Sequence, residues 1–100
     1  MSKYEMTVTQ EVEDYLDEIA EEMVGLFGIP TAEAVARINY EWRDQSFEEE
    51  DDLIFHELPE HWAYVLYYSG TVPYWDPEAD RTRWSIRNAP PAGDTAWTLH

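Results

Sequence analysis

Thr9–Phe27, with the sequence TQEVEDYLDEIAEEMVGLF, has the clearest helical pattern in this 100-residue chain. Its apolar residues recur at helical intervals, as expected for a helix that turns one face towards a core. They are Val12, Tyr15, Leu16, Ile19, Met23, Leu26 and Phe27. The rest of the circumference is acidic and carries Glu11, Glu13, Asp14, Asp17, Glu18, Glu21 and Glu22. The stretch therefore predicts a helix with a buried stripe and a dense negative surface.

Both ends of this helix carry the residues that usually stop one. Either Thr7 or Thr9 can cap the start, because a hydroxyl oxygen accepts a hydrogen bond from an unpaired N–H of the first turn. Thr7 with Gln10 also fits a capping box. Gly28 follows the last apolar position, where a left-handed residue commonly ends a helix.

A second helix is predicted at about Ala32–Arg43, after a short link through Pro30 and with Thr31 as its cap. Its apolar residues fall at helical spacing and should pack on the first helix; they are Ala34, Val35, Ile38 and Trp42.

A third helix is predicted from Leu58-Pro59-Glu60 to about Tyr68, because Pro suits the first helical position and Glu suits the first turn. Its inward residues would be Trp62, Val65 and Leu66. A strand is the alternative for Tyr64–Tyr68, which is rich in β-forming residues.

The rest of the chain is expected to be less regular. We expect residues 1–8 to be a frayed lead-in, residues 44–52 an exposed loop, and Leu53–Phe55 a short strand or extended segment. Residues 72–75 and 82–87 are predicted to pair as a hairpin, with Trp84 and Ile86 inward. Residues 88–100 form an extended or flexible end, pinned by Trp97 and Leu99.

The predicted fold class is mainly α, with α+β as the alternative. It has three helices and a small C-terminal β-hairpin or extended segment, in a single acidic globular domain spanning residues 1–100.

The formal net charge of −16 is the strongest feature of the composition. Residues 1–60 hold 18 acids against Lys3, Arg37 and Arg43. Such a surface repels nucleic acid and anionic membranes and attracts basic proteins. We therefore expect no direct nucleic-acid or membrane contact and a basic protein as the partner.

Several classes of site are disfavoured by the residues present. The chain has no cysteine, which removes disulfides, thiolate catalysis and Cys-based zinc sites. His56 and His61 are five apart, one more than a helical zinc motif allows. Asp76, Glu78 and Asp80 resemble the start of a calcium loop, but Arg81 stands where that loop needs glycine. We expect no metal, no cofactor and no enzymatic activity.

The location expected from the sequence is the cytoplasm. The chain has no apolar run of about 18 residues, and MSKYEMTVTQ at its start lacks the apolar region of a signal peptide.

Two functions remain open from the sequence. The first is an inhibitor of a basic partner, of the immunity-protein or nucleic-acid-mimic kind, in which carboxylates contact the Lys and Arg residues that normally hold phosphate. Its candidate binding residues are Glu13, Asp14, Asp17, Glu18, Glu21, Glu48, Glu49, Glu50, Asp51, Asp52, Tyr74 and Trp75. The second is a structural or adaptor domain that binds through its aromatic C-terminal half, while its acidity serves only solubility.

Overall fold

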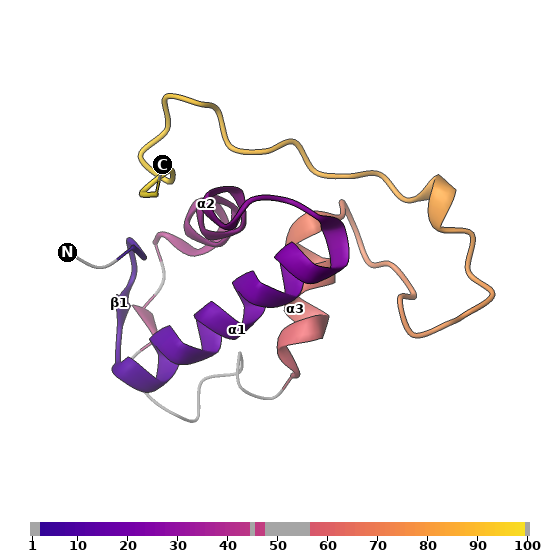
Figure 1. The fold of residues 1–100 in the computed structure, drawn as a ribbon, viewed down its shortest axis with the longest axis horizontal. Coiled ribbons are helices and arrows are strands. Elements are labelled where there is room, and N and C mark those ends of the chain that lie inside the picture. The colour runs from indigo at the N-terminus through magenta and orange to yellow at the C-terminus, as the bar shows by residue number, and fades with distance from the viewer. Residues whose placement is uncertain (1–2, 45, 48–56, 100) are drawn as a thin grey trace.

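The computed structural model describes residues 3–44, 46–47 and 57–99, and its fold is mainly α, as predicted (Figure 1). The helices are α1 (Gln10–Phe27), α2 (Thr31–Trp42) and α3 (Pro59–Tyr67). Two short strands, β1 (Thr7–Val8) and β2 (Ser46–Phe47), pair in parallel, and a 3-10 helix, η2, spans Arg81–Arg83. The predictions for Glu48–Asp52 and Leu53–Phe55 concern residues outside the described ranges.

Helix α1 is the centre of the core and packs against both α2 and α3 (Figure 1). Leu16, Ile19 and Met23 have no exposed surface, which confirms the predicted apolar stripe. Leu26, at the edge of that stripe, is 41% exposed and is not a core residue. The Thr9 hydroxyl accepts the Val12 N–H and caps the helix, so the capping box predicted from Thr7 is wrong because Thr7 lies in β1. Gly28 ends the helix at φ 69°.

Helix α2 begins one residue earlier than predicted. The Ala34 N–H donates to the Pro30 carbonyl at 3.1 Å, so Pro30 is the capping position and Thr31 already lies in the first turn. The predicted cap at Thr31 is therefore wrong. The four predicted apolar residues of α2 are all buried.

Helix α3 settles the ambiguity at Tyr64–Tyr68 in favour of a helix that ends at Tyr67. Its buried residues are Ala63, Tyr64 and Leu66, whereas Trp62 and Val65 are half-buried. The inward face is thus rotated slightly from the predicted one. Tyr64 is buried because aromatic residues from the C-terminal half pack on it.

The N-terminal residues are not a frayed lead-in, and that prediction is wrong. Tyr4 and Met6 are only 3% and 4% exposed and belong to the core. The fully buried side chain of Asn39 holds this segment in place. Its Oδ1 accepts the Glu5 N–H at 2.8 Å, and its Nδ2 donates to the carbonyls of Lys3 and Ala96, each at 3.0 Å. One side chain in α2 therefore joins the two ends of the chain, which lie on the same side of the molecule (Figure 1).

Of the two predicted forms of the C-terminal part, the extended one is present, and the hairpin between residues 72–75 and 82–87 does not form. In its place, the residues after η2 pair with the end of α3: Ser69 N–H donates to the Ser85 carbonyl, and Arg87 N–H donates to the Tyr67 carbonyl. The carboxylate of Asp80 accepts the Thr82 N–H and turns the chain into η2, which prevents a strand from starting there. Ile86, predicted to point inward, is 55% exposed.

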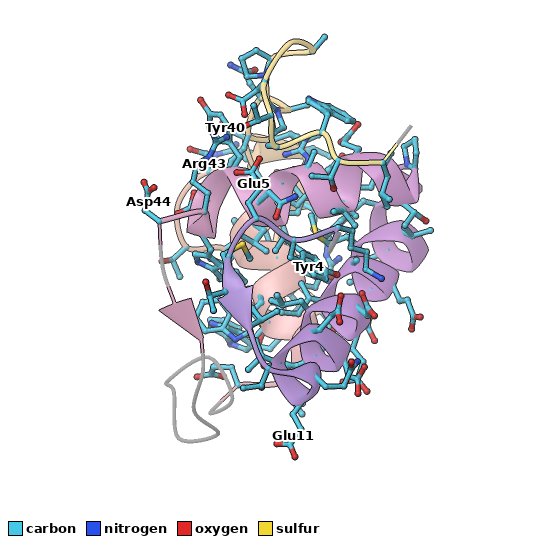
Figure 2. All side chains as sticks on the ribbon, turned by 90° about the vertical axis from the view of Figure 1, so that its left-hand side faces the viewer. Tyr4, Glu5, Glu11, Tyr40, Arg43 and Asp44 are labelled. Carbon is cyan, nitrogen blue, oxygen red and sulfur yellow. The ribbon has the colours of Figure 1, made fainter. Side chains whose placement is uncertain are left out.

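Residues 88–99 form an irregular segment with turns at residues 92–96, and Asn39 of α2 holds it through the Ala96 carbonyl. Leu99 packs against the core and pins the segment as predicted, whereas Trp97 Nε1 donates to the Pro90 carbonyl at 3.0 Å, a bond within the segment itself. Arg43, the residue that follows α2, forms an ion pair with Asp94 and lies beside Glu5 and Tyr40 (Figure 2).

This ion pair predicts an acid-sensitive contribution to stability. The Ala96 N–H and then Arg43 lower the pKa of the Asp94 carboxyl below its usual value of about 4. A depressed folded-state pKa gives stability that is present above the unfolded-state pKa and is lost as pH falls through the folded-state pKa. Asp94→Asn should therefore lower the melting temperature at pH 7, and the difference from the parent protein should shrink below about pH 4. A difference that stays constant in thermal melts from pH 7 to pH 3 would contradict this.

Candidate functional site

All six basic side chains have structural partners within the protein. Five of them pair with carboxylates, in the pairs Lys3–Asp17, Arg37–Glu33, Arg43–Asp94, Arg83–Asp80 and Arg87–Glu41. The sixth, Arg81, donates to the Tyr64 hydroxyl and the Tyr74 carbonyl, and its guanidinium lies 5.2 Å from the centre of the Trp84 ring. The cations therefore cannot neutralise the remaining acids without leaving these contacts.

The uncompensated charge is clearest on the outer face of α1. Glu18, Glu21 and Glu22 are exposed, and the described part of the chain shows no ion pair to any of them. Glu18 and Glu22 are four residues apart on one helix, where like charges repel. The last turn of α1 contains no basic residue that would offset them. This face is therefore electrostatically unfavourable in the isolated protein.

The predicted acids of α1 do not all belong to this face. Asp17 accepts a hydrogen bond from the Tyr4 hydroxyl at 2.7 Å. It also forms an ion pair with Lys3, with 2.8 Å between Oδ1 and Nζ. Burial and then this hydrogen bond raise the pKa of Tyr4 far above that of an exposed phenol. Asp17 is thus part of the link that holds the N-terminal segment on α1.

Glu13 and Asp14 are also less available than Glu18 and Glu21. Glu13 is half-buried, and Asp14 accepts a hydrogen bond from Gln10 Nε2 at 2.9 Å. Glu22 was missing from the predicted binding residues, although its position one turn after Glu18 was visible in the sequence. The other predicted acids, Glu48–Asp52, lie outside the described residues.

Glu18, Glu21 and Glu22 line one side of a groove of about 490 Å³. Its other lining residues are Gly25, Leu26 and Pro59, so the groove lies between the second half of α1 and the start of α3. The Tyr15 hydroxyl donates to the Glu57 carbonyl, which fixes the entry to α3 beside α1. Leu58, next to Pro59 in the chain, is 73% exposed. The groove therefore combines an acidic rim with accessible apolar surface.

The aromatic residues of the C-terminal half mainly contact one another. Tyr74 stacks on Tyr64 with 4.6 Å between ring centres, and its hydroxyl is 3.2 Å from Nδ1 of His61. Burial raises the pKa of Tyr74, as expected for a phenol inside a cluster. Trp75 packs edge-on against Tyr74 and remains 67% exposed. Of the two aromatic residues predicted to bind a partner, only Trp75 presents most of its surface to solvent.

The candidate metal ligands have other roles where the structure describes them. Asp76 and Asp80 accept the N–H groups of Glu78 and Thr82 and so cap turns. His56 is outside the described residues. Among residues 3–44, 46–47 and 57–99, no three His, Cys, Asp or Glu side chains gather in a way that could hold a metal ion.

In the same ranges, no helix combines the length and the apolar character needed to cross a membrane. No family model matches the chain, and no match was found among curated proteins or solved structures.

Proposed function

We propose that this protein is a non-enzymatic inhibitor that binds a basic partner through the outer face of α1. The observation that supports the proposal is the set of exposed carboxylates at Glu18, Glu21 and Glu22, which no described cation neutralises. Lys or Arg residues of a partner would relieve the repulsion among these acids. Charge complementarity of this kind raises association rates and suppresses wrong partners.

The proposed mechanism is occlusion of a phosphate-binding surface. Glu18, Glu21 and Glu22 lie within about 6 Å along the axis of α1, so they can engage Lys or Arg side chains that lie close together on the partner. A nuclease or another nucleic-acid-binding protein carries such cations where it holds phosphate groups. The proposed setting is the cytoplasm, where such a partner would otherwise meet nucleic acid.

Competition with nucleic acid tests this mechanism. A basic partner would be captured from lysate at low salt, purified, and bound to a labelled DNA or RNA duplex. The protein should displace the duplex in proportion to its own occupancy of the partner. Formation of a ternary complex, with the duplex affinity unchanged, would argue against occlusion.

The acidic stretch Glu48–Asp52 provides a second prediction. Replacing Glu48, Glu49 and Glu50 by glutamine should slow association with the captured partner several-fold, because long-range attraction acts mainly on the encounter step. The dissociation rate should change much less. Stopped-flow association at two salt concentrations measures both, and an unchanged on-rate would remove this stretch from the binding surface.

Trp75 supports the second candidate function, an adaptor that binds through its aromatic half. Exposed tryptophan is a common anchor at protein interfaces. In that case Trp75→Ala would abolish binding to the captured partner, and neutralising α1 would have little effect. Inhibition through the outer face of α1, without the contribution of Trp75 that the sequence suggested, predicts the opposite pattern.

A further inference from the structure

Gly25 lies on the same stripe of α1 as the uncompensated acids. It follows Glu18, Glu21 and Glu22 by seven, four and three positions, which places all four residues on one helical face. All four line the groove between α1 and α3. Gly25 therefore lies in the groove directly beside the three acids of its rim.

Among residues 3–44, 46–47 and 57–99, no contact requires a glycine at this position. The positive-φ glycines are Gly28 and Gly70, and Gly25 is not among them. A Cβ built on Gly25 would meet no atom of the described residues within 4 Å, apart from its chain neighbours and the backbone of its own helix. Other residues favour a helix more than glycine does, so its presence here is not explained by the stability of α1.

Glycine on an exposed helical face lets the backbone of another chain approach closely. Around Gly25 the groove offers accessible apolar surface, since Leu26, which is 41% exposed, and the half-buried Pro59 both line it. Its rim offers only negative charge. An occupant that fits must therefore combine a close backbone, an apolar side and cationic side chains.

We infer that this groove binds a basic amphipathic helix of the partner. The helix would pass over Gly25, place an apolar side chain against Leu26 and Pro59, and direct Lys or Arg side chains to Glu18, Glu21 and Glu22. This helix-in-groove mode uses apolar anchors at helical spacing for affinity and charge for orientation. The inference rests on the proposed function and names the element of the partner that is recognised.

Two synthetic peptides of about 18 residues test the inference, since shorter helices form poorly in water. One is an amphipathic helix of Leu, Ala and Arg, and the other is a scramble with the same composition and charge but no apolar face. The amphipathic peptide should bind about tenfold more tightly by calorimetry. Amide NMR shifts should place it at Gly25 and Leu26.

Gly25→Gln supplies the matching variant of the protein. A long polar side chain should block the close approach and lower the affinity for the amphipathic peptide about tenfold, while the affinity for the scramble should not change. The same change should raise the melting temperature by about 2–4 °C, because glutamine favours a helix more than glycine does. The control is Gly93→Gln, since Gly93 also has open space around an added Cβ and does not line this groove. It should leave both affinities unchanged.

The outcomes separate this inference from the proposed function. Two results would contradict helix binding in the groove while leaving the charge-based function intact. One is equal affinity for the two peptides, and the other is an affinity for the amphipathic peptide that Gly25→Gln does not change. If neither peptide binds at low salt, the proposed function fails as well.

Discussion

Replacing Asn39 by alanine is expected to lower the free energy of unfolding by about 3 kcal/mol. The side chain is fully buried and bonds to Lys3, Glu5 and Ala96 at once. Thr98 still donates to the Lys3 and Ala96 carbonyls in the variant, but the Glu5 N–H loses its acceptor. The loss therefore combines one unsatisfied donor with a small cavity.

Urea unfolding followed by tryptophan fluorescence measures this change. Asn88→Ala is the matched control, because Asn88 is exposed and its loss should shift the free energy by less than about 0.5 kcal/mol. Similar midpoints for the two variants would show that Asn39 does not join the chain ends in solution. The expected result is a lower free energy of unfolding for Asn39→Ala alone.

Neutralising Glu18 and Glu22 together is expected to slow association with the basic partner about tenfold. The double variant Glu18→Gln/Glu22→Gln removes two charges from the groove rim and makes no change in the core. Because the two acids repel each other across one helical turn, the fold should be unchanged or slightly more stable. A loss of binding would therefore not reflect unfolding.

The control for this variant changes the same net charge elsewhere. Asp44→Asn/Glu78→Gln also removes two exposed carboxylates, and neither residue lines the groove. Surface plasmon resonance should show a small decrease in the association rate for the control and a much larger decrease for the groove variant. Equal losses would mean that total charge, and not the outer face of α1, determines binding.

The helices could be predicted because their signals are local. The apolar spacing of α1, the cap at Thr9 and the left-handed Gly28 all act within a few residues of one another. The two ends of the chain could not be predicted in this way. Asn39 brings residues 3–5 and 96 together. Neither sequence periodicity nor composition predicts a contact between residues more than fifty positions apart.

The predicted C-terminal hairpin does not form, for a related reason. The alternation around Trp84 and Ile86 is typical of a strand, but the local bond from Asp80 competes with that preference and produces η2. The acids of the site were visible as a helical stripe. The groove was not visible, because Pro59 meets that stripe only after α3 packs on α1.

Salt dependence distinguishes binding through the acidic face of α1 from binding through apolar contacts. Affinity for the captured basic partner would be measured from about 50 to 300 mM salt, a range over which exposed charges become strongly screened. We expect the affinity of the parent protein to fall at least about tenfold, and that of Glu18→Gln/Glu22→Gln to fall much less. An affinity that stays constant across the range would contradict binding through the acidic face of α1.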